Sequence, residues 1–354
     1  VLSRHGICES SLSSAGMGIT CSSGKERGPT QKFKNTAVRG KGGAVQEPSN
    51  DKQRTVALII AFDYVGYPAE ERSGCGQLSC SPDALRFASL AKASGAETHV
   101  FCDQPHMPEN KGHPVKDTVI AQMKQFGKLL GPGDTFVFYF AGHGDNVKEK
   151  AKADGTTQEA EGMDEEMCFV DASGVYTPIR DNEVADILLN SFNSLTKVLF
   201  VTDCCNSGTV CDLGRPEFKA RPYAHMAAVT DKQEAQDLGD GGAFTSALVE
   251  TVETLVKEGT SLPQASSRRH PAAARSKISL PQVYNHAFKT YSGKFSKQDF
   301  RLETTPDLDP DTFGWPLIPP KGWSVQTLLD PQVDKYLKEK LAKPAVCSPF
   351  CGIF

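Results

Sequence analysis

Three long apolar runs stand out in the central part of the chain. They are VALIIAF (56–62), TFVFYFA (135–141) and KVLFVTD (197–203). Apolar runs of this length predict strands that are covered on both faces, since a strand with one wet face alternates apolar and polar residues. Two further runs, ETHVFCD (97–103) and AHMAAVTD (224–231), also predict strands.

The segments between these runs carry apolar residues with the spacing of a helix. SPDALRFASLAKAS (81–94) has Pro82 near its first turn and apolar residues at positions 85, 88 and 91. Helices are also predicted at residues 115–130, 181–192, 244–259, 280–291 and 326–342. Strands that alternate with helices predict an α/β fold, in which a mostly parallel central sheet is flanked by helices on both faces.

The two ends of the chain differ in character from its middle. Residues 1–53 are rich in Gly, Ser, Lys and Arg and hold few large apolar side chains, so burial cannot readily offset the entropy of ordering them. We therefore expect a flexible leader over 1–53, one folded domain over 54–320 and a C-terminal tail over 321–354. An exposed basic loop is expected at 261–277.

The composition narrows the class of protein. Hydrophobic residues make up 39% of the 354 positions, enough for a sizeable core, and the net charge of −4 gives no general attraction for nucleic acid or an anionic membrane. The eleven cysteines lack paired spacing, which favours a reducing compartment over a disulfide framework. Neither a membrane-spanning run nor a signal peptide is recognisable, so we expect a cytoplasmic protein, whose natural start lies upstream of the first Val.

Two of the predicted strands run into reactive side chains. The run at 135–141 is followed by His143, and the run at 197–203 is followed by Cys204 and Cys205. Parallel sheets bind ligands at the carboxyl ends of their strands, so these side chains are expected at one edge. A thiolate is a strong nucleophile, and a neighbouring imidazole can generate it and later protonate a leaving amine.

Other interpretations of these residues stay open on the pattern alone. A histidine after a strand is often structural, and a buried cysteine pair is often inert packing. Zinc bound by His143, Cys204 and Cys205 is a further alternative, although a fourth ligand and the usual Cys-x-x-Cys spacing are missing. For a peptidase, backbone N–H groups at Gly144 and Cys205 could hold the oxyanion.

Several motifs together resemble one family. YFAGHG (139–144) and DCCNSGT (203–209) closely resemble the two active-site motifs of metacaspases, which have the caspase-like cysteine peptidase fold. The other similar segments are a Tyr-x-Gly loop at 64–66, a Leu-x-Cys-x-x-Asp motif at 78–83, DGGAFTSALVETV (240–252) and PDLDPDTFGWPLIP (306–319). The resemblance spans roughly 55–318 and implies a peptidase domain with a large-subunit-like part, 54–215, and a small-subunit-like part, 222–320.

The resemblance also implies roles for individual residues. By that match His143 is the base, Cys205 is the nucleophile and Cys204 is a structural neighbour. The pocket for the residue before the scissile bond is assigned to Cys80, Asp83, Asp203 and Ala141, the last at a position where metacaspases usually have Ser. Two carboxylates facing one cavity favour a cation between them, so we expect cleavage after Arg or Lys.

Metacaspases are commonly activated by calcium. The family's calcium ligands map onto Asp164, Asp181, Asn182 and Asp212, and oxygen ligands of this kind suit Ca²⁺. The family tends to have Asp where Asn182 stands, which lowers the charge of the site. The alternative is that Asp164, in EGMDEE (161–166), belongs to a solvated acidic loop and that Asp181 caps a helix. No organic cofactor is expected.

These expectations describe a calcium-stimulated cysteine endopeptidase that acts as a monomer on proteins or peptides with Arg or Lys before the scissile bond. We also expect a latent enzyme that cuts itself in flexible basic segments. The candidate self-cleavage sites are Lys25, Arg27, Lys32, Lys34, Arg39, Lys41, Arg215, Lys219, Arg221, Arg268 and Arg269. The rivals are an Asn-specific endopeptidase of the legumain group, disfavoured by the acidic pocket, and a non-proteolytic scaffold or thiol redox sensor.

Overall fold

The structure is a computed structural model. It describes residues 53–66, 76–149, 163–231, 233–259, 278–292, 298–325 and 331–341. The predicted leader, apart from its last residue, and the predicted basic loop 261–277 lie outside these residues. Within the described residues, no helix combines the length and apolar character needed to cross a membrane.

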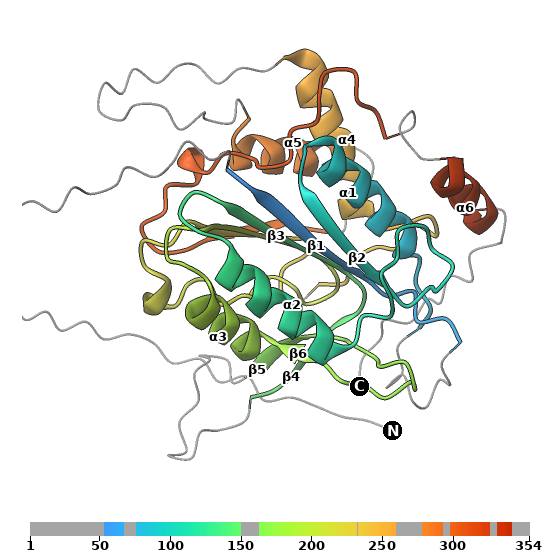
Figure 1. The fold of residues 1–354 in the computed structure, drawn as a ribbon, viewed down its shortest axis with the longest axis horizontal. Coiled ribbons are helices and arrows are strands. Elements are labelled where there is room, and N and C mark those ends of the chain that lie inside the picture. The colour runs from blue at the N-terminus through green and yellow to red at the C-terminus, as the bar shows by residue number, and fades with distance from the viewer. Residues whose placement is uncertain are drawn as a thin grey trace, which may run out of the picture. The chain divides into compact units, whose positions relative to one another are not determined.

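The centre of the fold is a six-stranded sheet with the strand order β2-β1-β3-β7-β8-β9 (Figure 1). Its strands are β1 (Thr55–Ala61), β2 (Glu97–Cys102), β3 (Thr135–Ala141), β7 (Lys197–Asp203), β8 (Tyr223–Ala227) and β9 (Arg301–Thr304). All neighbouring pairs are parallel except β8 and β9, which are antiparallel. The predicted mostly parallel sheet is thereby confirmed.

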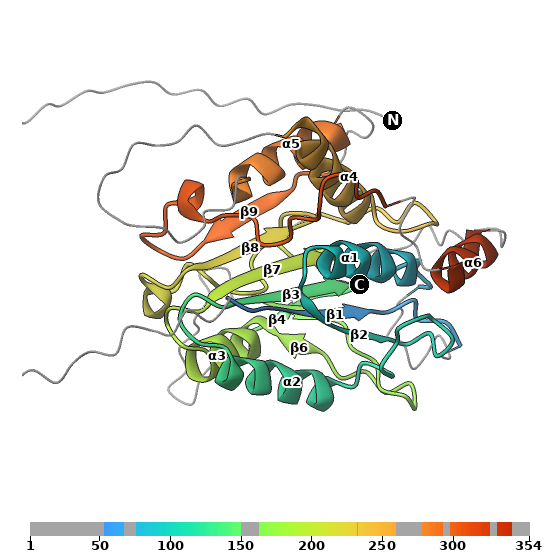
Figure 2. The same ribbon diagram turned by 45° about the horizontal axis from the view of Figure 1, so that its top comes forward.

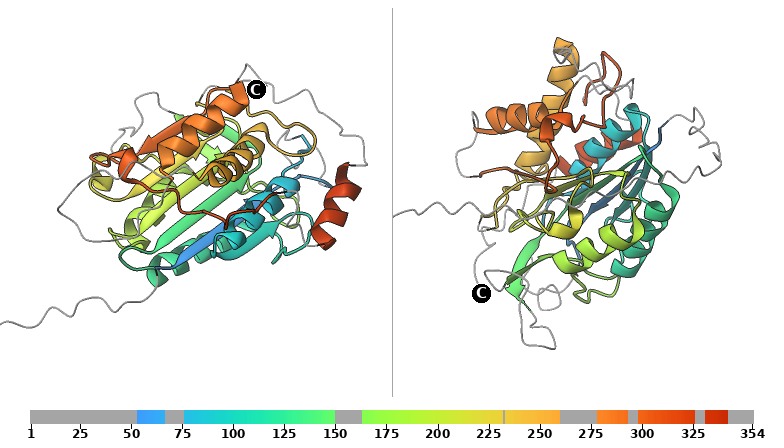
Figure 3. Two further views of the ribbon diagram at one scale, coloured as in Figure 1. Left: turned by 90° about the horizontal axis from the view of Figure 1, so that it is seen from above. Right: turned by 90° about the vertical axis from the view of Figure 1, so that its left-hand side faces the viewer.

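Helices cover both faces of this sheet, as predicted for the α/β class. One face carries α1 (Ser81–Ala93), α4 (Ala243–Glu258) and α5 (Leu280–Ser292), and the other carries α2 (Lys116–Leu129) and α3 (Asp181–Ser191) (Figures 2 and 3). The helix α6 (Pro331–Leu341) lies beside α1. Two short 3₁₀ helices complete the list, at Pro216–Phe218 and Pro310–Thr312.

The apolar runs are continuous because both faces of the strands are buried. Along β1, Ile59 packs in the cluster under α1 and α4, whereas Leu58 packs in the cluster under α2 and α3. Tyr139 and Phe138 divide in the same way on β3. Truncating one such side chain to Ala typically costs about 2–5 kcal/mol, so these strands form a firm base for the loops at their ends.

A second, three-stranded sheet was not predicted. It consists of β4 (Gly144–Lys148), β5 (Met163–Met167) and β6 (Ile179–Arg180), paired antiparallel in the order β4-β5-β6. The alternative that Asp164 belongs to a solvated acidic loop at 161–166 is wrong, because Asp164 lies on β5 and is buried. Burial of its charge is tolerated because Arg180 on β6 pairs with it.

Element ends differ from prediction in a few places. The strand predicted at 224–231 ends at Ala227, and the helix predicted at 326–342 is observed as Pro331–Leu341, with 326–330 outside the described residues. The antiparallel edge strand β9 was missed because its four residues carry too short a pattern to signal a strand.

Candidate active site

The register of two neighbouring strands brings the histidine and cysteine motifs to one edge. Strands β3 and β7 pair in parallel, with Ala141 opposite Asp203, so both chains leave the sheet at the same level. The backbone N–H of Gly142 donates to the carbonyl of Asp203 over 3.3 Å, which continues the pairing by one residue. His143 and Cys205 each follow within two residues of these ends.

The two motifs are in direct contact at a glycine. A Cβ atom at Gly144 would collide with the carbonyl oxygen of Cys205 and would lie 3.1 Å from the Sγ of Cys204. Only a residue without a side chain permits this approach. The structure therefore brings together the segments that carry His143 and Cys205, and it places Gly144 and Cys205, the positions expected to supply oxyanion N–H groups, next to each other.

The imidazole of His143 is held in one orientation. Its Nε2 lies 2.8 Å from the carbonyl oxygen of Gly76, and since a carbonyl can only accept, Nε2 carries the proton and Nδ1 keeps the lone pair. The Tyr64 ring packs against it at 4.8 Å between centroids. The Tyr64 hydroxyl accepts from the N–H of His143 (2.9 Å) and donates to the carbonyl of Cys168 (2.7 Å).

Tyr64 is itself held in an unusual conformation by buried carboxylates. Its φ is +54°, which is rare for a bulky residue, and such strain concentrates at functional sites. Asp103 accepts from the backbone N–H of Tyr64 (2.7 Å) and of Asp63 (2.9 Å), and Asp63 accepts from Ser81 at the start of α1. Burial and the charge of Asp63 raise the pKa of Asp103 to about 6. This network ties the loop behind His143 to the helix that carries Asp83.

Cys205 and Cys204 have different environments. Cys204 is 1% exposed and packs in the apolar cluster under α2 and α3, as expected of a structural neighbour. The Sγ of Cys205, which is 6% exposed, accepts a hydrogen bond from the backbone N–H of Ala235 over 3.3 Å. A donor on the sulfur stabilises negative charge there, so Cys205 is the thiol better suited to act as a thiolate.

Asp83 and Asp203 border the same turn. A Cβ atom at Gly241 would collide with the Asp83 carboxylate, and one at Gly242 would collide with the Asp203 carboxylate. The N–H of Gly242 donates to Asp83 over 2.6 Å, while Asp203 accepts from the N–H and hydroxyl of Thr245 over 3.0 and 2.7 Å. The two predicted pocket carboxylates are thus neighbours, and the glycine pair is what allows the chain to close over them.

The electrostatics of this pair favour a cation. Burial and the charge of Asp203 raise the pKa of Asp83 well above its usual range, against the opposing effect of Arg86. Burial raises the pKa of Asp203 to about 6. The thiol of Cys80 is kept neutral by burial and by nearby carboxylates, which raise its pKa. The charges of Asp83 and Asp203 act on Cys80, and Ala141 pairs in register with Asp203, so the other two predicted pocket residues lie in the same region.

Two charged residues near the pocket were missed. Asp237 accepts from the N–H of Ser79 over 2.7 Å, and its charge contributes to the raised pKa values of Asp83 and Asp203. Arg86 lies 3.3 Å from Asp83 but donates more closely to the carbonyl of Asp240, at 2.6 Å. The i,i+3 spacing of Asp83 and Arg86 on α1 could have signalled that pair, whereas nothing in the sequence pointed to Asp237.

The four residues expected to bind calcium are also brought together. Asp164 lies on β5, Asp181 and Asn182 begin α3, and Asp212 lies in the loop after Cys205. The Asp181 carboxylate also makes a contact outside α3, because it accepts a hydrogen bond from the backbone N–H of Glu165 on β5 over 3.0 Å. Asn182 donates to Asp164 over 3.3 Å.

The arrangement does not fit a calcium ion, because two arginines occupy the oxygens. Arg180 Nη1 lies 3.0 Å from Asp164 Oδ2, and Arg215 Nη2 donates to Asn182 Oδ1 over 2.7 Å and to Asp212 Oδ2. Among the described residues, no group of three or more His, Cys, Asp or Glu side chains is placed to hold a metal ion. The zinc alternative at the cysteine pair therefore gains no support either.

Comparison with known proteins agrees with this geometry. A family model described as "Metacaspase, peptidase C14 domain" matches residues 56–214, a range that includes β1, β3, β7 and both catalytic motifs. Over these residues the chain is similar to metacaspases. Cysteine peptidases are the class to which this family belongs.

Curated proteins that are similar to this chain are named metacaspases. Metacaspase-2 of Trypanosoma brucei brucei is 30% identical over 165 residues, which cover 45% of this chain and 44% of that protein. Metacaspase-2 of Arabidopsis thaliana is 34% identical over 159 residues, 44% of this chain and 35% of that protein. The chain thus matches less than half the length of these relatives. Another relative is named "Inactive metacaspase-4" and is 26% identical over 172 residues. The match covers 48% of this chain and 43% of that protein.

A solved structure shares the fold. The crystal structure of a Geobacter sulfurreducens protein is 20% identical with a TM-score of 0.52, and the match covers 74% of this chain and 97% of that one. At this identity the likeness extends to the fold alone.

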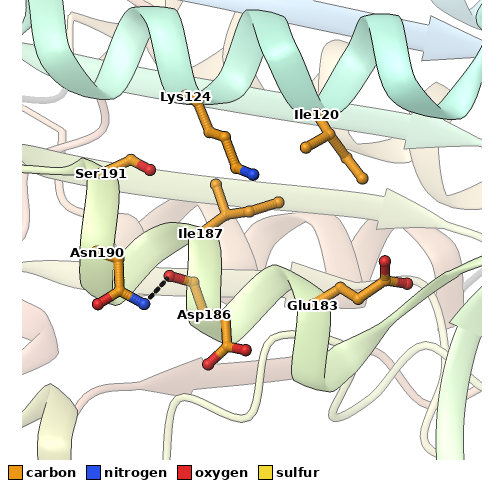
Figure 4. A pocket seen from close by; sticks show the side chains of 7 residues that line it. All are labelled: Ile120, Lys124, Glu183, Asp186, Ile187, Asn190 and Ser191. Carbon is orange, nitrogen blue, oxygen red and sulfur yellow. Dashed lines mark hydrogen bonds between the residues drawn. The ribbon is translucent and has the colours of Figure 1, made fainter.

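A surface hollow is lined by other residues than those of the candidate site. It has a volume of about 260 Å³ and lies between α2 and α3 (Figure 4). Its lining residues are Ile120, Lys124, Glu183, Asp186, Ile187, Asn190 and Ser191. None of them is a predicted site residue, and Asn190 is already bonded to the carbonyl of Asp186 over 2.8 Å. We assign this hollow no part in the chemistry.

Proposed function

We propose that this protein is a cysteine endopeptidase that cleaves after Arg or Lys through a thioester on Cys205. The observation that supports this most is the contact at Gly144, which joins the segments of His143 and Cys205 at the carboxyl edge of the sheet. The name of the inactive relative shows that the fold alone does not guarantee activity, so the proposal depends on these residues.

The proposed reaction has two stages. His143 Nδ1 takes the proton of the Cys205 thiol, and the thiolate attacks the carbonyl carbon of the scissile bond. Backbone N–H groups at Gly144 and Cys205 hold the developing oxyanion. His143 then gives its proton to the leaving amine, and water, deprotonated by the same imidazole, hydrolyses the thioester to release the acid product.

The proposed specificity follows from the charges at the turn of Gly241 and Gly242. Asp83, Asp203 and Asp237 contribute three carboxyl groups, and Arg86 shares its guanidinium between Asp83 and Asp240. The balance is acidic, so a substrate ammonium or guanidinium would favour the ionised carboxylates, whereas a substrate carboxylate would be repelled.

Hydrolysis of four matched fluorogenic peptides, differing only in Arg, Lys, Asn or Asp before the scissile bond, tests this function. We expect turnover of the Arg and Lys peptides by the wild type and none by Cys205→Ala. Preference for the Asn peptide would favour the legumain-like alternative. Absence of Cys205-dependent turnover of any peptide would favour a scaffold or redox sensor.

Self-cleavage is part of the proposal. Arg221 donates to the carbonyls of Leu188 and Phe192, and Arg215 is held by Asn182 and Asp212, so neither side chain is free to enter a substrate pocket. Lys219 is 69% exposed and is the better candidate in this loop. The candidates in the leader and at 268–269 lie outside the described residues. Intact-mass analysis is expected to show fragments ending in Lys or Arg from the wild type and none from Cys205→Ala.

A further inference from the structure

The residues expected to bind calcium form a cluster with two arginines. We call Asp164, Arg180, Asn182, Asp212 and Arg215 the arginine–carboxylate cluster. Its contacts run in a chain from Arg180 to Asp164, on to Asn182, to Arg215 and finally to Asp212. The four ionised side chains are mostly buried, with exposed fractions of 25% for Arg180, 4% for Asp164, 20% for Arg215 and 7% for Asp212. Solvent therefore screens these contacts less than it screens surface ion pairs.

The amide of Asn182 shows how the cluster is oriented. A guanidinium only donates, so the atom 2.7 Å from Arg215 must be the amide oxygen of Asn182. The amide nitrogen then faces Asp164, 3.3 Å away. A metal ion shared by Asp164 and Asn182 would need the oxygen on that side. The observed orientation suits the arginine and opposes a cation between the two residues.

The charge balance is that of a site already occupied. Arg180 lies 3.0 Å from Asp164 and 3.4 Å from Glu166. Arg215 pairs with Asp212. The guanidinium groups of Arg180 and Arg215 together carry two positive charges, the same as one divalent cation.

The cluster also joins the elements that a metal ion would join. Arg180 on β6 faces Glu166 across the small sheet and contacts Asp164 on β5. Arg215 connects the loop after Cys205 to Asn182 at the start of α3. The segment that follows the nucleophile is therefore fastened to the small sheet and to α3 by side chains of the protein itself.

We propose that Arg180 and Arg215 take the place of a calcium ion, so that the loop after Cys205 keeps its conformation and the peptidase works without metal. This inference rests on the proposed peptidase function, and it replaces the expected calcium stimulation by an internal cation. Calcium gains affinity for the active conformation only if it can displace a guanidinium that already serves that conformation.

The first test measures Arg-peptide hydrolysis by the wild type in a strong calcium chelator and in millimolar calcium. We expect the two rates to agree within about twofold, since a ligand that binds two states equally shifts nothing. A gain of more than about tenfold in calcium would overturn the inference and would support the calcium switch instead.

The second test removes the internal cation. Arg215→Gln is expected to lose at least about tenfold in chelator, because Asp212 and Asn182 lose their shared donor, and to regain activity in calcium, which now finds open oxygens. Arg215→Lys, which keeps the charge, is expected to stay active in chelator. Lys335→Ala, at an exposed position on α6, is the control. Full activity of Arg215→Gln in chelator would show that the cluster does not support the loop.

A third measurement does not depend on activity. The melting temperature, Tm, is measured with and without calcium for two proteins. The first is the single variant Cys205→Ala, and the second is the double variant Cys205→Ala with Arg215→Gln. We expect calcium to leave Tm unchanged in the first protein and to raise it in the second, since a ligand that binds only the folded state stabilises it. A calcium-induced rise in Tm with Arg215 present would overturn the inference even if the protein proved not to be a peptidase. An inert wild type with an unshifted Tm would instead contradict only the proposed function.

Discussion

Two acidic regions flank the proposed nucleophile, and they differ in how their charge is balanced. At the turn of Gly241 and Gly242, the carboxylates of Asp83 and Asp203 accept mainly from backbone N–H groups and a hydroxyl, with Arg86 engaged only in part. In the arginine–carboxylate cluster, Asp164 pairs with Arg180, and Asp212 pairs with Arg215. The first region can still take a cation, whereas the second already holds two.

The difference shows that acidic residues alone do not identify a cation site. Both regions were expected to bind positive charge, one from a substrate and one from calcium. What separates them is the position of nearby arginines, which the spacing of the carboxylates does not reveal. The partners of a carboxylate, rather than its presence, decide whether a cation gains by binding.

The largest expected effect concerns the thiol between the two regions. Cys205→Ala is expected to lower kcat/KM by more than about a thousandfold, because it removes the covalent catalyst while filling most of the same space. Cys204→Ala is expected to cost less than about tenfold, since that side chain only packs. A greater loss from the change at 204, measured by peptide hydrolysis, would mean that the wrong cysteine has been chosen.

The second effect tests the open region directly. Asp83→Ala and Asp203→Ala are each expected to reduce kcat/KM for an Arg peptide by about ten- to a hundredfold, the range of a charge-assisted contact of about 1.5–3 kcal/mol. Asp307→Ala serves as the control, because Asp307 is exposed and pairs only with Lys219 among the ion pairs of the described residues. An undiminished preference for Arg in both pocket variants would rule out the acidic pocket.

A pH effect of about tenfold or less is expected at the same site. The pKa of Asp203 is raised from 3.8 to about 6, so the carboxylate becomes ionised as the pH rises from 5 to 7 and kcat/KM for Arg peptides increases. The ratio of an Arg peptide to the matched citrulline peptide isolates this change from titration of the dyad. In Asp203→Asn the ratio is expected to stay flat over that range, and a rise there would assign the effect to another group.

The raised pKa of Asp203 also makes the stability of the fold depend on pH. The folded-state pKa of Asp203 lies above its ordinary value, so the folded protein binds this proton more tightly than the unfolded chain does. Its contribution to stability is therefore present below about pH 4 and is lost as the pH rises towards 6. A bound cation would recover this loss, which is how the proposed pocket would favour Arg or Lys over a neutral side chain.

The smallest effect concerns the hydroxyl that supports His143. Tyr64→Phe removes the hydroxyl that accepts from His143 and donates to Cys168. We expect kcat to fall about three- to tenfold with little change in KM, as befits a positioning residue. Tyr284→Phe, which loses one hydroxyl bond to Phe300, is the matched control. A change confined to KM would argue against this role.

The sequence allowed the central sheet to be predicted, and it allowed the histidine and cysteine motifs to be placed at the carboxyl ends of two neighbouring strands. Helices cover both faces of β1, β3 and β7, so the side chains of these strands are apolar on both faces. The continuous apolar runs were therefore enough to predict the strands. The small sheet was missed because the charged residues of β5 are buried by pairing with Arg180, which is distant in the sequence. A backbone partner such as the Gly76 carbonyl leaves no mark on residue type at all.

The contacts around the expected calcium ligands also could not be predicted from the sequence. Asp164, Asp181, Asn182 and Asp212 do lie together, as the family motif implies. The sequence could not show that Arg215 folds back onto Asn182 and Asp212, because that contact depends on the path of the loop after Cys205.

Competitive labelling tests the central claim most directly. The wild type is incubated with equal concentrations of two thiol-reactive peptide ketones that differ only in Arg or Asp at the position before the reactive group, and the modified residue is mapped by mass spectrometry. We predict that the Arg reagent labels Cys205 and that the Asp reagent does not react. Labelling of Cys205 by the Asp reagent, or labelling of Cys204 in its place, would contradict it.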